Sequence, residues 1–203
     1  YLRWTVLNRA ASQLSPEIER ANFDFYGKTL TGAIKQRPIE ERALQTINGS
    51  IGEALGKLYV EKKFPAEAKA KAEKMIQNIF KAFENRINAL PWMTKSTRAS
   101  AIAKLHKSRV KIGYPDKWRD YSALVIAGPA NGGSYFENMK SLSRWRFQRD
   151  VEKLSKPVDK EEWGMSPQTV NAYFNPSFNE IVFPAAILQP PFYNYQADEA
   201  VNY

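Results

Sequence analysis

A long amphipathic segment between Pro65 and Leu90 constrains the fold of this 203-residue chain more than any other feature. Apolar residues recur in it at steps of three and four, which marks one face of an α-helix. Pro65 suits the first turn of a helix, and Pro91 ends it because a residue that precedes proline is disfavoured in the helical conformation. We therefore expect one helix here with a core-facing stripe. The stripe consists of Ala68, Ala72, Met75, Ile76, Ile79, Phe80, Phe83, Ile87 and Leu90.

Other segments also predict helices. They are residues 4–14, 39–59, 94–106 and 135–154, and Thr94 or Ser96 supplies the N-cap of the third. The turn-forming residues 113–116 stop that third helix. Helices joined by short connections suggest an antiparallel helical lobe. The glycine-rich stretch 127–133 is the best candidate for a domain boundary, so we expect domains at 1–130 and 131–203.

The character of the sequence changes after Pro157. Residues 169–174 alternate in side-chain type, residues 180–183 are β-branched and aromatic, and the five residues between them have turn composition. We therefore predict a β-hairpin and a fold that is mainly α with a small β part. Asn171 lies in the middle of the first expected strand, where asparagine is disfavoured. An edge strand that recruits a peptide by strand addition would explain it, and an asparagine that faces solvent would explain it nearly as well.

Histidine and cysteine are too scarce for several kinds of site. The chain has no cysteine and a single histidine, His106, so disulfides, thiolate zinc sites and two-histidine zinc sites are excluded within it. His106 lies among lysines and arginines and is expected to be a surface residue. Asp159, Glu161 and Glu162 are interpreted as solvated acidic residues and not as an acid–base pair, because no histidine accompanies them. No apolar run is long enough to span a bilayer, so no transmembrane segment is predicted in this chain.

The net charge of +9 raises the possibility of a nucleic-acid partner. The basic excess lies in residues 1–130, and residues 144–149 interleave arginines with Trp145 and Phe147. Such a pattern would suit stacking and phosphate neutralisation on a single strand. We favour a solvated basic lobe and an amphipathic helix in which Trp145 is buried and the arginines extend to solvent. No nucleic-acid partner is therefore predicted.

Residues 170–193 resemble the neprilysin and endothelin-converting-enzyme family of zinc endopeptidases. Val170-Asn171-Ala172-Tyr173-Phe174 is similar to the substrate-binding Asn-Ala-aromatic motif of this family. Two further stretches follow it at the family's spacing: Asn179-Glu180-Ile181-Val182-Phe183-Pro184-Ala185, and Leu188-Gln189-Pro190-Pro191-Phe192. Similar residues occur along most of the chain. They are Leu58-Tyr59-Val60, Phe64, Trp92-Met93, Thr97, Ile112-Gly113-Tyr114-Pro115-Asp116 and Glu162-Trp163.

The resemblance implies a two-lobed enzyme with a helical lobe and a thermolysin-like, or zincin, catalytic lobe. Residues 1–130 would then be part of the helical lobe, and residues 131–203 would be the incomplete N-terminal part of the catalytic lobe. It also implies that Asn171 binds the substrate backbone through its side-chain amide and Ala172 through its carbonyl. Tyr173 and Phe174 belong to the motif, and no separate role is assigned to them. The His-Glu-x-x-His helix of the family is expected to follow Tyr203, so no catalytic or metal-binding residue is assigned within the chain.

We expect the intact parent to be a zinc-dependent endopeptidase that hydrolyses peptides on the amino side of apolar residues. The isolated chain is expected to bind no zinc and to be inactive. Its expected partners are the peptide substrate and the remainder of the catalytic lobe, and its exposed apolar surface predicts self-association. The lack of cysteine suits a bacterial member exported to the periplasm or cell envelope. The alternative is a non-catalytic helical interaction module that reuses the fold.

Overall fold

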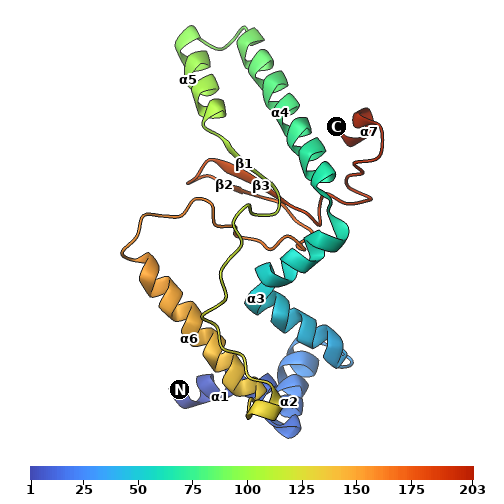
Figure 1. Cartoon of the computed structure of the whole chain (residues 1–203), viewed down its shortest axis with the longest axis vertical. Coiled ribbons are helices and arrows are strands. Elements are labelled where there is room, and N and C mark those ends of the chain that lie inside the picture. Colours follow the sequence, from blue (N-terminus) through green and yellow to red (C-terminus); the bar gives the residue numbers. More distant parts are fainter. The chain divides into compact units, whose positions relative to one another are not determined.

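The computed structural model describes all of residues 1–203 and shows a mainly helical chain with one small sheet (Figure 1). The expectation of a mainly α fold with a small β part is therefore confirmed. The helices are α1 (Leu2–Ala10), α2 (Pro16–Asn22), α3 (Ile39–Lys63), α4 (Ala66–Ala89), α5 (Lys95–His106), α6 (Tyr135–Lys153) and α7 (Glu199–Asn202), with the 3-10 turns η1 (Ala11–Gln13) and η3 (Pro129–Asn131) and the π-helix η2 (Phe23–Thr29). The strands are β1 (Arg109–Gly113), β2 (Tyr173–Asn175) and β3 (Glu180–Pro184).

The chain divides into two compact units. Unit 1 contains residues 1–50 and 120–158, and unit 2 contains residues 51–119 and 159–203. The sequence passes from unit 1 to unit 2 inside α3, at Ile51, where φ of −118° and ψ of 38° depart from helical values. Both units are discontinuous in sequence. The assignment of residues 1–130 and 131–203 to two lobes of the intact protein stays a prediction.

Unit 1 is a set of helices held by side-chain contacts between distant segments. The amide Nδ2 of Asn22 donates to Oδ1 of Asn8 at 2.7 Å. Trp145 of α6 is partly buried and stacks on Tyr121, with ring centroids 5.2 Å apart. Its neighbour Arg146 donates to the carbonyl of Ser50 at 2.8 Å. This part of the arginine-rich segment 144–149 is therefore used in contacts within the unit.

Unit 2 is built around the apolar face of α4. The helix begins after Pro65 and ends at Ala89, as the periodicity predicts. Ala68 and Ala72 on its inner face are fully buried, and Ile112 of β1 packs in the same cluster. The helix α5 follows with Thr94 as its N-cap, whose hydroxyl accepts a hydrogen bond from the Thr97 N–H at 3.2 Å. Figure 1 shows α4 and α5 as neighbouring helices, with β1 directly after α5.

The sheet has the strand order β1-β3-β2, with β1 parallel to β3 and β2 antiparallel to it. The predicted hairpin is confirmed as β2 and β3, but its first strand is shorter than predicted. Residues 169–172 precede the strand, so the expectation that Asn171 lies mid-strand is wrong. Strand β1 was not predicted, although the alternation of basic with β-branched side chains from Arg109 to Ile112 could have indicated it.

Gly113 ends β1 at a position that accepts no larger side chain. Its φ is +77°, a conformation that glycine adopts without the penalty that other residues incur. A Cβ atom on Gly113 would also lie 2.4 Å from Cε1 of Phe64 in the core. The strand therefore packs closely on the residues that precede α4. None of the helices combines the length with the apolar character required to cross a membrane.

Candidate functional site

The residues with a predicted site role lie at the open edge of the sheet. Strand β2 pairs with β3 on one side and has no strand on its other side. An edge strand presents unpaired backbone N–H and C=O groups to which another extended chain can add. Tyr173, Phe174 and Asn175 carry no charge, so the edge lacks the lysines that often block strand addition. The candidate site therefore consists of the backbone hydrogen-bonding groups along the open edge of β2.

Asn171 and Ala172 lie directly before this edge strand. Asn171 is exposed and Ala172 is partly exposed. The Oδ1 atom of Asn171 accepts a hydrogen bond from the Ala172 N–H at 2.8 Å, and the Asn171 N–H donates to the Thr169 carbonyl at 3.0 Å. These contacts fix the local backbone and orient the side-chain amide. The structure thus brings the two predicted binding residues together at the start of β2.

Tyr173 is the first residue of β2, and its side chain is fixed by the preceding loop. Its hydroxyl accepts a hydrogen bond from the Gly164 N–H at 2.8 Å. A Cβ atom at Gly164 would lie 3.3 Å from that hydroxyl, so glycine permits the close approach. Burial raises the pKa of the Tyr173 hydroxyl above its usual value, and the nearby charge of Glu180 acts in the same direction, while the hydrogen bond from Gly164 opposes them.

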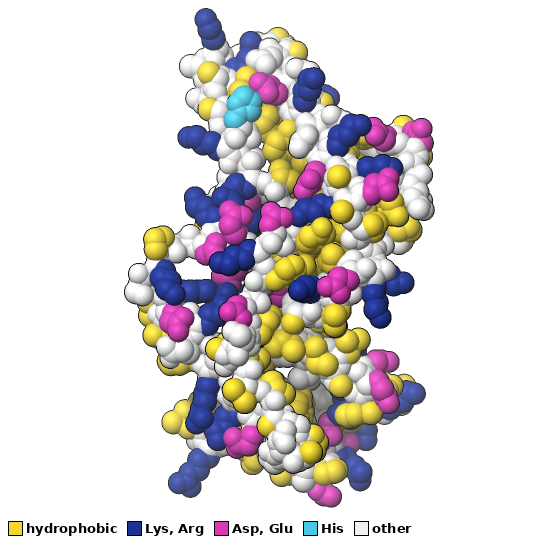
Figure 2. Space-filling model, viewed as in Figure 1, with side chains coloured by type: hydrophobic (Ala, Val, Ile, Leu, Met, Phe, Trp, Pro, Cys, Tyr) yellow, Lys and Arg dark blue, Asp and Glu magenta, His cyan; other side chains and the backbone are white.

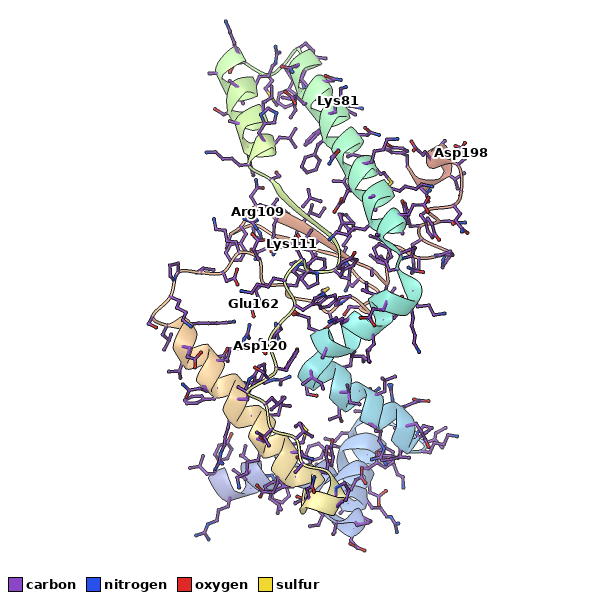
Figure 3. All side chains as sticks on the ribbon, viewed as in Figure 1. Lys81, Arg109, Lys111, Asp120, Glu162 and Asp198 are labelled. Atoms are coloured by element: carbon purple, nitrogen blue, oxygen red, sulfur yellow. The ribbon has the colours of Figure 1, made fainter.

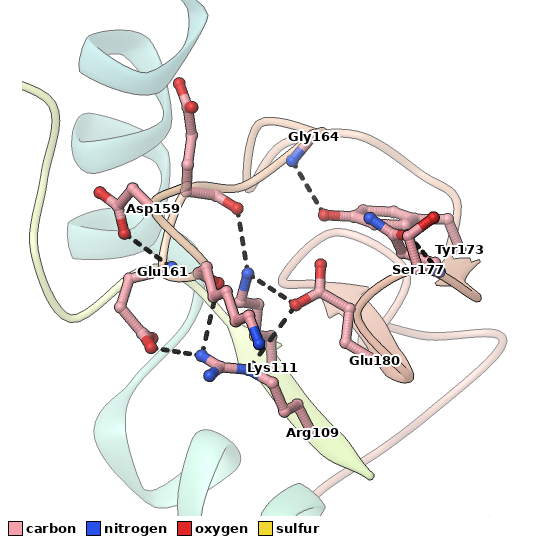
Figure 4. Close-up of polar contacts among 11 residues, drawn as sticks. Arg109, Lys111, Asp159, Glu161, Gly164, Tyr173, Ser177 and Glu180 are labelled. Carbon is pink, nitrogen blue, oxygen red and sulfur yellow. Dashed lines mark hydrogen bonds and ion pairs between the residues drawn. The ribbon is translucent and has the colours of Figure 1, made fainter. Parts of the chain in front are cut away.

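A buried ion pair supports the hairpin on the face of the sheet that also carries Tyr173 (Figure 4). The Nζ atom of Lys111 lies 3.0 Å from Oε2 of Glu180, and both residues are buried. Oε2 has no aligned hydrogen bond, so its contact with Lys111 is an ion pair held by charge. Lys111 also donates to the Glu162 carbonyl at 3.0 Å. The pair therefore joins β1, β3 and the loop that holds Tyr173.

Further charges surround this pair at the edge of unit 2. Arg109 forms an ion pair with Glu161, and its Nε lies 3.9 Å from Oε2 of Glu180. The carboxylate of Glu162 lies 3.3 Å from the guanidinium of Arg119. Figure 3 shows Arg109, Lys111 and Glu162 on and beside β1.

The acidic residues at 159–162 therefore serve in structural contacts. Glu161 and Glu162 pair with arginines, and Asp159 accepts a hydrogen bond from the Glu161 N–H at 2.8 Å. Asp159 and Glu161 are also exposed, as expected of solvated residues, and Glu162 is partly buried. Lys111 and Glu180 were not predicted to be charged residues of the core. Their burial depends on a parallel pairing between residues far apart in sequence, which no local pattern reveals.

The residues present do not fit a zinc site. His106 is exposed and its Nε2 lies 3.0 Å from Oε2 of Glu84. No group of three or more histidine, aspartate or glutamate side chains is arranged to hold a metal ion. A zinc site of the thermolysin type requires two histidines and a carboxylate around one ion. No step of the chemistry can therefore be assigned to a metal held by this chain.

The basic residues of the chain do not form one patch on the face drawn in Figure 2. Lysine and arginine side chains are interspersed there with aspartate and glutamate. Several of the basic side chains pair with carboxylates, among them Lys69 with Asp116 at 2.9 Å and Lys74 with Glu199 at 3.2 Å. This distribution is typical of a solvated surface, and the edge strand β2 remains the best candidate site.

Comparison with known proteins places the chain in a peptidase family. Residues 1–115 and residues 171–203 each match Peptidase family M13. Neprilysin-3 of Drosophila melanogaster is 35% identical over 210 residues, which covers 100% of this chain and 26% of that protein. A neutral endopeptidase of Lactobacillus helveticus is 35% identical over 197 residues, which covers 97% of this chain and 30% of that protein. The chain therefore spans less than a third of these relatives.

Solved structures show the same fold. Zinc metalloprotease ZMP1 of Mycobacterium tuberculosis in its open state is 46% identical with a TM-score of 0.89, and the match covers 98% of this chain and 30% of that one. PepO from Lactobacillus rhamnosis is 27% identical with a TM-score of 0.84, over 96% of this chain and 30% of that one. The family match over more than half of the sequence agrees with the Asn-Ala-aromatic edge strand. The chain belongs to peptidase family M13, the family of the neprilysins and endothelin-converting enzymes.

Proposed function

We propose that this chain supplies the peptide-binding edge of a zinc-dependent endopeptidase. In the intact protein the side-chain amide of Asn171 and the carbonyl of Ala172 hold the substrate backbone, and the substrate is cut on the amino side of an apolar residue. The observation that carries the proposal is the open edge of β2 with Asn171 and Ala172 at its start. A peptide added to this edge needs only backbone groups for its affinity.

The reaction itself requires groups that this chain does not bring together. Zinc would supply a bound water of lowered pKa and would polarise the scissile carbonyl. The part of this chain in the reaction is positioning, which prevents the substrate from binding in unproductive arrangements. The isolated chain is therefore proposed to be inactive. An exported location of the intact protein stays a prediction, which fractionation of cells that make it would test.

The proposal predicts a specific effect of Asn171→Ala in the intact peptidase that contains this chain. Loss of a hydrogen bond to the substrate backbone should lower kcat/KM by about ten- to a hundredfold. Zinc content should remain that of the wild type, because Asn171 binds peptide and not metal. Steady-state hydrolysis of a fluorogenic peptide and metal analysis of the same preparation check both points.

Asn131→Ala is the matched control, because Asn131 is exposed in η3 of unit 1 and outside the candidate site. It should leave kcat/KM unchanged. Loss of zinc from the Asn171→Ala protein, or unchanged hydrolysis, would contradict the assignment. An intact wild-type protein that hydrolyses no peptide would favour the alternative of a non-catalytic helical interaction module.

A further inference from the structure

The sheet carries a row of apolar side chains that leads to its open edge. The strand register places Val110 of β1 opposite Ile181 of β3, and Ile181 opposite Phe174 of β2. Cross-strand partners lie on the same face of a sheet, so these three side chains form one row. Val110 is 36% exposed, Ile181 is partly buried and Phe174 is 57% exposed. The most exposed member of the row is therefore the one at the edge where a peptide would add.

The two aromatic residues of the motif lie on opposite faces of β2. Successive side chains of a strand alternate, so Tyr173 shares its face with Val182, its partner in β3, whereas Phe174 shares its face with Ile181. The Tyr173 hydroxyl is engaged by the Gly164 N–H. Phe174 has no hydrogen-bonding group and no aromatic partner within the chain. Of the two aromatic side chains, only Phe174 is available to a ligand.

We propose that Phe174 is a specificity-determining residue that contacts one side chain of the bound peptide. The inference rests on the proposed function, because it requires a peptide on the open edge of β2. Side chains that face each other across two strands have Cβ atoms about 4.5–5.5 Å apart, which is within reach of a phenyl ring. The peptide residue opposite Phe174 extends the apolar row by one strand. The enzyme therefore prefers peptides that carry an apolar, and preferably aromatic, side chain at this position.

The strand register limits Phe174 to one position of the bound peptide. Tyr173 and Asn175 lie on the opposite face of β2, so Phe174 is the residue of the strand that presents its side chain on this face. Only the preference for the peptide residue that pairs with Phe174 should therefore depend on it.

The test measures hydrolysis of a peptide series by the intact peptidase that contains this chain. One peptide position at a time carries Phe, Leu or Ser, and kcat/KM is measured for the wild type and for Phe174→Ala. The wild type should prefer Phe over Ser at one position of the series, the one that pairs with Phe174. Phe174→Ala should reduce that preference by roughly five- to tenfold, which corresponds to the loss of an aromatic contact. Preferences at the remaining positions should stay unchanged.

Three variants make the outcome decisive. Phe174→Tyr keeps the ring and should keep the preference, while Phe174→Leu should lose the preference for Phe but retain that for Leu. Phe147→Ala removes another exposed phenylalanine, on α6 of unit 1, and should change no preference. Unaltered preferences in both Phe174→Ala and Phe174→Leu would overturn this inference. The proposed function would still stand in that case if Asn171→Ala slows hydrolysis of every peptide alike, and would itself fail if it does not.

Discussion

The two neighbouring aromatic residues of the motif lie on different faces of the sheet because the side chains of a strand alternate. Tyr173 turns towards the Gly164 loop, and Phe174 turns towards Ile181 and solvent. The motif could be recognised from the sequence, but the faces could not be assigned from it. The expected strand 169–174 began too early, and only the observed pairing with β3 sets which residue lies opposite which. The burial of Glu180 could likewise not be predicted from the sequence, since a glutamate beside a turn is usually exposed.

The raised pKa of Tyr173 predicts a loss of stability at alkaline pH. The folded pKa lies above the unfolded value of about 10, so the unfolded chain releases this proton first as the pH rises. The stabilisation is fully present below the unfolded pKa and is lost as the pH rises through the folded pKa. Burial likewise raises the pKa of Tyr59 and of Tyr193, which add to the effect.

Urea unfolding from about pH 8 to about pH 11 measures this loss. The Tyr173→Phe chain should show a shallower fall in the free energy of unfolding above pH 10 than the wild type. Tyr1→Phe is the matched control, because Tyr1 is 98% exposed, and it should follow the wild-type curve. A Tyr173→Phe curve that runs parallel to the wild type would show that the hydroxyl is not perturbed in the folded chain.

At the scale of the elements, helices followed from the sequence far better than strands. The helix α4 depends on an apolar periodicity that continues through its 24 residues. The helix α5 depends on an N-cap whose hydroxyl accepts a hydrogen bond from the N–H three residues further along. The strand β1 depends on a parallel partner about 70 residues further along the chain, so no local signal fixes its burial. Residues 180–183 could be predicted as a strand because β-branched and aromatic side chains are concentrated there.

The Lys111–Glu180 ion pair should be the main side-chain link between β1 and the hairpin, beside the backbone hydrogen bonds of the strands. Lys111→Ala leaves the buried carboxylate of Glu180 without its closest partner, so we expect a loss of roughly 3 kcal/mol in the free energy of unfolding. The double change Lys111→Met with Glu180→Gln removes both charges and should recover much of that loss. Chemical denaturation followed by circular dichroism gives both values.

Lys117→Ala serves as the control for this series, since Lys117 is exposed and should change the stability by less than about 0.5 kcal/mol. A Lys111→Ala chain as stable as the Lys117→Ala chain would mean that the ion pair does not hold the hairpin.

At the scale of the whole molecule, the proposed function assigns peptide positioning and metal chemistry to different parts of the polypeptide. The chain covers about 30% of the ZMP1 chain that it resembles and contains no grouping of metal-binding side chains. The family could be identified from the sequence because the hairpin motif and several helical segments agree with it. No arrangement of the edge strand with a zinc ion could be derived, since the chain has one histidine and a thermolysin-type site needs two.

The central claim is that β2 binds a peptide backbone, and hydrogen exchange of the chain with a peptide tests it most directly. The backbone N–H groups of β2 (Tyr173–Asn175) that face its open edge should exchange more slowly when an extended apolar peptide is present, because the peptide pairs with them. The protection should decline in the Asn171→Ala chain and persist in the Asn131→Ala chain. Peptide-dependent protection confined to other segments, with residues 173–175 unchanged at saturating peptide, would contradict the claim.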